Sequence, residues 1–242
     1  MIYTNGGGAL NKPSVSIIAC TNRPEFFTNI LNNYRNQRYL YKELIIIVNK
    51  NAIDIRPLRQ QARSLPNVSV YQVPERISLG QCLNCGIARA RHTLIAKFDD
   101  DDYYAPNYLK EQVKALILTR SSVVGKHSCL VYLAGSKKLV IRSPEERDKF
   151  VNFVQGGTIL FRSNVLKDVR FADISLGEDV RFLRSCGKKG HKIYSTSPYN
   201  YVYIRRKNKG THTWKVNDRF YLRGSQSVAV TKHYRSFANR KA

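Results

Sequence analysis

The first half of the chain alternates short apolar runs with longer amphipathic stretches. Runs rich in β-branched and aliphatic residues predict buried strands at 14–20, 43–48, 68–73 and 93–98. After each run, apolar residues recur every three to four positions, which predicts a helix there, the last one starting at Pro106. Strands that are apolar throughout and alternate with helices indicate a mostly parallel sheet covered on both faces.

The second half has shorter apolar runs and more turn residues. Residues 122–141 predict two or three short strands, and 192–196 and 199–204 predict two more. Residues 145–150 predict a helix. Gly177 precedes another helix, which carries two acids in its first turn, where the helix dipole favours them.

Charge is distributed unevenly along the sequence. The chain has 41 Lys and Arg against 17 Asp and Glu, a formal net charge of +24. Residues 205–242 hold eleven of the basic residues and one acid, Asp218, with aromatic residues interspersed. This stretch predicts either a basic helical extension or a partly disordered tail. The charge favours anionic partners: nucleotide phosphates, nucleic acid, or an anionic membrane or polymer.

No apolar run approaches the roughly 18 residues that a membrane-spanning helix needs. Residues 1–12 contain three consecutive glycines and lack the apolar core of a secretory signal, so they predict a flexible lead-in. We therefore expect a cytoplasmic protein. For its basic tail two alternatives stay open: peripheral attachment to an anionic membrane or polymer surface, or simple solvation.

Four consecutive aspartates, Asp99, Asp100, Asp101 and Asp102, follow the fourth predicted strand. Adjacent carboxylates repel one another unless a cation relieves the repulsion. Carboxylate oxygens are hard ligands that suit Mg²⁺ or Mn²⁺. The alternative is a solvated acidic turn that caps the next helix, but a cap needs one Asp and not four. The aspartate quartet therefore predicts a divalent metal site.

Polar residues also follow the other predicted strands. Thr21, Asn22 and Arg23 come after the first strand, and Asn49 comes after the second. In parallel sheets, ligands bind beyond the carboxyl ends of the strands. Three strands therefore bring polar groups to one rim of the sheet, where we expect the ligand.

Four segments of the chain resemble, in order, the inverting family 2 glycosyltransferases of the GT-A fold. They are SVSIIACTNRPEFFTNIL, SLGQCLNCGIARARHTLIAKFDDDDYYAP, GGTILFR and LGEDVRF. The resemblance covers about residues 13–215. It implies a mostly parallel central sheet flanked by helices, with a nucleotide-binding half at 13–105 and a smaller acceptor half at 106–215. Residues 216–242 would then be a basic C-terminal extension.

The resemblance also implies an activity. Such an enzyme moves a sugar from a nucleotide-diphosphate sugar to a hydroxyl of a glycan, a polymer or another acceptor, with Mn²⁺ or Mg²⁺ as cofactor. The family often places an Asp where this chain has Asn49, and an amide offers two donors where a carboxylate offers only acceptors. We expect a uridine-diphosphate sugar, but Asn49 leaves the identity of the base open.

By position in the matching motifs, the resemblance gives roles to the aspartate quartet. Asp99 would contact the nucleotide and the metal, with Asp100 beside it in the nucleotide site. Asp101 would ligate the metal that bridges the diphosphate, and Asp102 would support that site or contact the sugar. His212, in GTHTW, matches the place of a further metal-binding histidine, although a loop histidine of this kind is equally often just exposed.

The remaining roles fall on the rim and on the second half. Thr21, Asn22 and Arg23 would line the nucleotide pocket. The acceptor or sugar would lie against three consecutive residues, Gly156, Gly157 and Thr158.

Asp179 would be the general base, with Glu178 beside it. A base of this kind removes the proton of the attacking hydroxyl from the face opposite the leaving group, so the product is inverted and the transition state resembles an oxocarbenium ion. The simpler interpretation of Glu178 and Asp179 is an acidic pair at a helix N-terminus.

Three other classes of protein fit the sequence less well. The net charge fits a nucleic-acid-binding protein, but such a surface gains nothing from four consecutive carboxylates, so we expect no specific nucleic acid. A non-catalytic GT-A-like domain would not need both the quartet and Asp179. A metal-dependent nucleotidyltransferase would use an Asp cluster, but the Gly-Gly and Glu-Asp elements fit it poorly.

Overall fold

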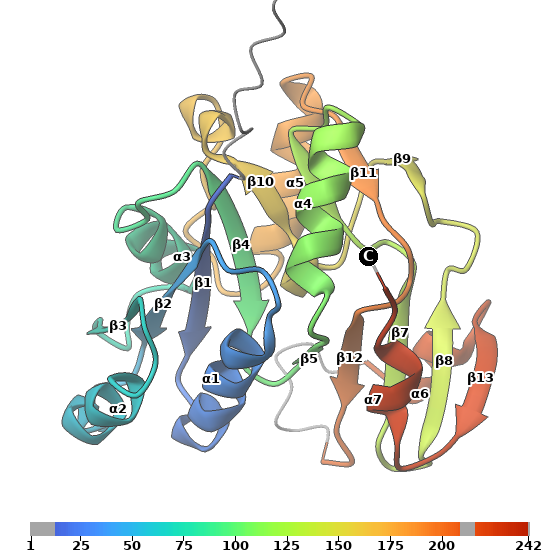
Figure 1. Ribbon diagram of the computed structural model, residues 1–242, viewed down its shortest axis with the longest axis horizontal. Coiled ribbons are helices and arrows are strands. Elements are labelled where there is room, and N and C mark those ends of the chain that lie inside the picture. The colour runs from blue at the N-terminus through green and yellow to red at the C-terminus, as the bar shows by residue number, and fades with distance from the viewer. Residues whose placement is uncertain (1–12, 209–215, 242) are drawn as a thin grey trace, which may run out of the picture.

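A computed structural model describes residues 13–208 and 216–241 of the chain (Figure 1). The predicted lead-in at 1–12 and the candidate metal ligand His212 lie outside the described residues. The described chain forms two sheets. An eight-stranded sheet has the order β3-β2-β1-β4-β10-β6-β11-β9, and a five-stranded sheet, at the lower right of Figure 1, has the order β13-β8-β7-β12-β5.

The first half forms the parallel part of the larger sheet, as its hydrophobic pattern predicts. The strands are β1 (Val15–Thr21), β2 (Lys42–Val48), β3 (Val68–Gln72) and β4 (Leu94–Asp99), all paired in parallel. The helices are α1 (Phe27–Asn36), α2 (Ile55–Ala62), α3 (Leu79–Ile87) and α4 (Tyr108–Leu118). Each lies within a few residues of its predicted place.

Side chains on alternating positions of the strands enter two separate cores. On β1, Ile17 belongs to the core that α1 and α4 cover, whereas Ile18 belongs to the core that α3 covers together with α5 (Glu178–Lys188). Both faces of the parallel strands are therefore buried, which explains why their sequences are apolar throughout.

The larger sheet continues with strands from the second half. They are β6 (Val123–Gly125), β9 (Lys149–Val151), β10 (Leu160–Arg162) and β11 (Ile193–Ser195). The predicted helix at 145–150 is wrong, because residues 149–151 instead pair with β11 as an antiparallel edge strand. Asp148 adopts a left-handed backbone with a φ of 53°, which a helix interior excludes.

The smaller sheet joins two distant parts of the chain. Its strands are β5 (Tyr103–Tyr104), β7 (Cys129–Leu133), β8 (Lys138–Arg142), β12 (Tyr201–Arg205) and β13 (Gln226–Val230). β5 pairs with β12 directly after the aspartate quartet. The quartet therefore lies where the chain passes from the end of β4 in one sheet to the start of β5 in the other.

Residues 216–241 of the C-terminal stretch are part of the fold rather than a helical extension or a tail. Residues 216–241 form two short helices, α6 (Asp218–Leu222) and α7 (Tyr234–Ala238), and between them β13 pairs antiparallel with β8. Tyr221 and Ala238 are buried. The segment folds back onto the domain because β13 pairs with the edge of β8 and because Tyr221 and Ala238 pack into hydrophobic cores. Among the described helices, none has the length and apolarity that a bilayer span requires.

A buried carboxylate, Glu43, ties the first two strands to the turn before β4. It accepts hydrogen bonds from the Ser16 hydroxyl at 2.6 Å, from the backbone N–H of Arg91 at 2.8 Å and from Arg91 Nε at 2.7 Å. Burial alone would raise the pKa of Glu43, but the contacts with Ser16 and Arg91 outweigh it and hold that pKa below its ordinary value.

We predict that Glu43→Gln lowers the free energy of unfolding by about 1–3 kcal/mol at pH 7, because it removes a charged acceptor from the buried Ser16 hydroxyl and from Arg91. A carboxyl whose pKa is lower in the folded state stabilises the fold above its unfolded pKa, and this contribution is lost as the pH falls through the folded pKa. The difference between wild type and variant should therefore shrink below about pH 4.3. Urea denaturation of both proteins at pH 7 and at pH 3.5 measures this difference in the free energy of unfolding. Equal stability of wild type and variant at pH 7 would contradict the prediction.

Candidate active site

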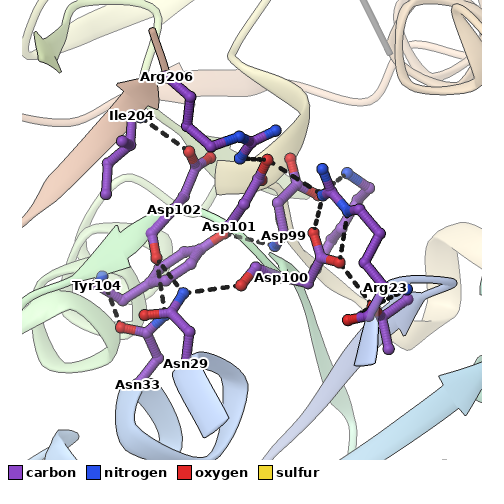
Figure 2. A network of polar contacts seen from close by, with 12 residues as sticks. Arg23, Asn29, Asn33, Asp99, Asp100, Asp101, Asp102, Tyr104, Ile204 and Arg206 are labelled. Atoms are coloured by element: carbon purple, nitrogen blue, oxygen red, sulfur yellow. Dashed lines mark hydrogen bonds and ion pairs between the residues drawn. The ribbon is translucent and has the colours of Figure 1, made fainter. Parts of the chain in front are cut away.

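Two asparagines of α1 hold the backbone of the aspartate quartet in place. Asn29 Nδ2 donates to the carbonyl oxygens of Asp100 at 2.7 Å and Asp102 at 2.9 Å. Asn33 Nδ2 also donates to Asp102, and Asn33 Oδ1 accepts from the backbone N–H of Tyr104 at 3.1 Å. Figure 2 shows both amides beneath the turn. These contacts fix the shape of the turn and therefore the directions of its four carboxylates.

Asp99, the first member of the quartet, is paired with a buried lysine. Lys97 Nζ contacts Asp99 Oδ1 from two positions earlier on β4. Burial opposes the charge of Lys97, but the nearby carboxylates of Asp99, Glu178 and Asp179 outweigh that effect and raise the pKa of Lys97. Lys97 is therefore a permanent cation inside a group of acids.

Asp100 is buried, and its carboxylate accepts hydrogen bonds from two residues that follow or end β1. Thr21 Oγ1 donates to Asp100 Oδ2 at 2.6 Å, and Arg23 donates through Nε at 3.2 Å and through a terminal nitrogen. Burial and the neighbouring Asp101 raise the pKa of Asp100 to about 6, against the opposing effect of Arg23. The structure thus brings Thr21, Arg23 and Asp100 together, as the rim argument predicts.

The side chains of Asp101 and Asp102 lie in different surroundings. Asp101 lies 3.1 Å from the Arg23 guanidinium and also contacts Arg206, which follows β12 (Figure 2). Asp102 is fully buried and accepts hydrogen bonds from the Tyr201 hydroxyl and from the backbone N–H of Ile204 at 3.0 Å. Of the two roles expected for Asp102, this position favours support of the site over contact with the sugar.

Two consecutive glycines bring the acids of the two sequence halves into one site. A Cβ on Gly156 would lie 2.1 Å from Asp179 Oδ2, and a Cβ on Gly157 would lie 2.7 Å from Asp99 Oδ2. Only a backbone without side chains allows both carboxylates to approach so closely. The adjacent Thr158 is buried, and its hydroxyl accepts a hydrogen bond from the backbone N–H of Lys126 at 2.9 Å. This contact ties the Gly-Gly segment to the residue that follows β6.

The two acids of α5 differ in their surroundings. Glu178 is buried, and burial raises its pKa to about 7, with Asp179 adding to the rise and Lys97 opposing it. Asp179 is partly exposed, and its Oδ1 accepts from the backbone N–H of Val180 at 2.7 Å. Asp179 is therefore the better placed of the two to meet a substrate hydroxyl.

Two predicted site residues, Asn22 and Asn49, stand apart from this cluster, and a third is not described. Asn49 Nδ2 donates to the carbonyl of Pro74 at 2.8 Å, so it closes the loop that follows β3. Asn22 is exposed at the turn after β1. His212 lies outside the described residues. Whether Asn22 and Asn49 contact a nucleotide stays a prediction.

Several residues of the site were not singled out from the sequence. Lys97, Arg206, Asn29 and Asn33 contact the quartet directly. The two asparagines lie four residues apart on one face of a predicted helix, which is a weak signal. Lys97 is a charged residue inside an apolar strand, and this was the clearest signal in the sequence for a buried counter-ion.

The carboxylates of the site meet part of what a divalent ion needs. Within residues 13–208 and 216–241 no three His, Cys, Asp or Glu side chains are grouped so that they could hold a metal by themselves. Asp99 and Asp101 are both partly exposed and offer the carboxylate oxygens that Mg²⁺ and Mn²⁺ prefer. Mg²⁺ is typically bound by one or two carboxylates and the phosphates of a substrate. The residues therefore fit an ion that is shared with a diphosphate.

Comparison with known proteins places this arrangement in a family. Residues 16–164 match the sequence model described as Glycosyl transferase family 2. The chain belongs to this family. The poly-beta-1,6-N-acetyl-D-glucosamine synthases of Staphylococcus aureus strains COL and MSSA476 are each 24% identical over 192 residues. The match takes in 73% of this chain and 46% of each relative, so the chain spans less than half the length of these proteins.

Solved structures show that this family 2 chain has the GT-A fold. TarS 1-349 of S. aureus, in complex with UDP-GlcNAc, superposes with a TM-score of 0.66 at 18% identity, over 87% of this chain and 64% of that one. The mannosyltransferase PcManGT of Pyrobaculum calidifontis, in complex with GDP-Man and Mn²⁺, superposes with a TM-score of 0.64 at 18% identity, over 89% and 63%. The expectation of a mostly parallel α/β sheet of the GT-A type is confirmed.

Proposed function

We propose that this chain is a metal-dependent inverting glycosyltransferase that moves a hexose from a uridine-diphosphate sugar to an acceptor hydroxyl. The observation that carries the proposal is the approach of Asp99 and Asp179 to the adjacent glycines 157 and 156. Asp99 at the carboxyl end of β4 and Asp179 at the start of α5 thereby lie against two consecutive residues of the chain. Family membership supports the reaction class.

In this proposal the carboxylates have separate tasks. Asp99 and Asp101 would hold Mn²⁺ or Mg²⁺, and the bound ion would neutralise charge on the leaving diphosphate. Asp179 accepts the proton of the acceptor hydroxyl, which attacks the anomeric carbon from the opposite face and inverts it. Lys97 lies among Asp99, Glu178 and Asp179, and its charge opposes the rise that burial causes in the pKa of Glu178. The ligands of TarS and PcManGT support a nucleotide-sugar donor.

We predict that UDP raises the melting temperature in the presence of Mn²⁺ and raises it much less in EDTA, because a ligand that binds only the folded state stabilises it. Asp101→Asn should remove the metal-dependent part of the shift. Asp148→Asn serves as the control, since Asp148 is exposed and Asn tolerates its left-handed backbone. Differential scanning fluorimetry measures both, and an equal UDP shift in EDTA would refute the metal requirement.

A second prediction separates donor binding from transfer. Asp179→Asn should leave the Mn²⁺-dependent UDP shift nearly intact and lower the rate of transfer to an acceptor about 100-fold or more, the scale of general-base removal. The assay follows UDP release from UDP-sugars with a panel of glycan acceptors. Near-normal transfer by the variant would mean that the base lies elsewhere.

We also propose that the C-terminal residues dock the protein on an anionic membrane or polymer. Six basic residues are exposed between 216 and 241, and Asp218 is the only acid there. The exposed basic residues are Arg219, Arg223, Lys232, Arg235, Arg240 and Lys241. Each cation near an anionic surface contributes about 1 kcal/mol at best, and the effect decays within a Debye length of about 8 Å.

Truncation is a poor test of this docking, because it would remove β13 from the sheet. We predict instead that replacing Arg219, Arg223 and Lys232 with Gln lowers co-sedimentation with phosphatidylserine vesicles, or retention on polyphosphate, about tenfold or more at low salt. The matched control replaces Arg63, Lys110 and Lys114, which are equally exposed. Equal losses in the two triple variants would show that only the net charge matters.

A further inference from the structure

Two buried tyrosines hold consecutive carbonyl groups of the Gly-Gly segment, residues 156–158. The Tyr104 hydroxyl, from β5, donates to the carbonyl oxygen of Gly157 at 2.6 Å. The Tyr108 hydroxyl, from the first residue of α4, donates to the carbonyl oxygen of Thr158 at 2.9 Å. Both tyrosine side chains are fully buried, so a carbonyl that lost its hydroxyl partner would have no water to replace it.

The Tyr104 hydroxyl also holds the end of β4. It accepts a hydrogen bond from the backbone N–H of Asp99 at 2.8 Å, and its ring extends from β5 back toward Asp99 (Figure 2). One oxygen atom therefore joins the main chain of Asp99 to that of Gly157. A Cβ on Gly157 would lie 2.7 Å from Asp99 Oδ2 and 3.2 Å from the Tyr104 hydroxyl, so both groups lie against the same residue.

Packing fixes the rings of the two tyrosines. The Tyr104 ring is stacked on that of Phe98, with a centroid distance of 3.7 Å and an angle of 3° between the planes. The Tyr108 ring lies edge-on to both, at 5.0 Å from Tyr104 and 5.5 Å from Phe98. A phenylalanine at either position keeps these ring contacts, so each hydroxyl can be removed without disturbing the aromatic core.

We propose that Tyr104 and Tyr108 are positioning residues for the transfer step. Their hydroxyls fix the Gly-Gly segment relative to Asp99. The segment in turn limits where Asp179 can lie, because a Cβ on Gly156 would be 2.1 Å from Asp179 Oδ2. The separation between the donor side and the base thus depends on two buried hydroxyl groups. This inference rests on the proposed function and adds to it what aligns the two sides of the site.

Alignment matters more for transfer to an acceptor than for hydrolysis of the donor. The hydroxyl of a large acceptor reacts only when it is held in line, and a misplacement of about 1 Å can lower such a rate about 100-fold. Water is small and free to turn, so hydrolysis tolerates the same misplacement better. The ratio of transfer to hydrolysis therefore reports alignment, whereas a loss of folded protein lowers both rates equally.

The test measures this ratio in wild type, Tyr104→Phe and Tyr108→Phe, with a UDP-sugar, Mn²⁺ and a glycan acceptor that the wild type uses. The ratio should fall about tenfold in Tyr104→Phe. It should fall by a smaller factor in Tyr108→Phe, because the Tyr104 hydroxyl holds Asp99 as well as the segment. The dissociation constant of UDP in Mn²⁺, measured by calorimetry, should change less than about twofold, since the carboxylates remain and only alignment is lost.

Tyr34→Phe is the matched control. Tyr34 is also buried, and its hydroxyl donates to a backbone carbonyl, that of Pro66, at 2.8 Å. Pro66 lies just before β3, at the end of the parallel strands opposite the site. Tyr34→Phe should therefore keep the ratio of wild type.

Three results would count against these proposals. An unchanged ratio in Tyr104→Phe, or in Tyr108→Phe if the first variant does not fold, would overturn the positioning role alone. A loss of UDP affinity as large as the loss of transfer would also overturn it, because the effect would then lie in donor binding. A wild type that neither transfers nor hydrolyses a UDP-sugar would overturn the proposed function.

Discussion

The mutual repulsion of six carboxylates is the constraint on which the described structure depends. Asp99 to Asp102 come from the turn after β4, and Glu178 and Asp179 come from the start of α5. Cations that lie among such acids offset the repulsion between them. Lys97, Arg23 and Arg206 meet that need from three different elements, so the site requires both halves of the chain.

Asp102 shows how the two sheets depend on each other through this site. Its backbone is held by asparagines of α1, and its side chain is held by β12, about a hundred residues further along the chain. Since β12 and β5 are paired, any loosening of the smaller sheet reaches the quartet directly. A site built in this way cannot be separated from the C-terminal part of the fold.

The local pattern of apolar and polar residues was enough to predict most of the parallel sheet and the position of the aspartate quartet. The apolar strands β1 to β4 are buried on both faces, so their sequences carry a strong signal that does not depend on distant residues. The helix expected at 145–150 failed because one left-handed residue, Asp148, decides the outcome there. The strand β13 was missed because it exists through pairing with β8, and its own sequence is short and half exposed.

One counter-ion of the site, Arg206, could not be predicted from the sequence. Arg206 is one of 41 basic residues, and only the folded chain shows that it meets Asp101. The resemblance to a family placed Gly156 and Gly157 on the acceptor side, but it did not predict that Asp179 and Asp99 approach them so closely.

The two adjacent glycines also limit how such a site can change. Since Asp179 and Asp99 approach bare backbone, any side chain at 156 or 157 would collide with one of these two carboxylates. Redesign of donor or acceptor preference therefore has to leave 156 and 157 untouched. Substitutions are easier to accommodate at the rim of the sheet, at positions such as Asn22, because its side chain is exposed to solvent.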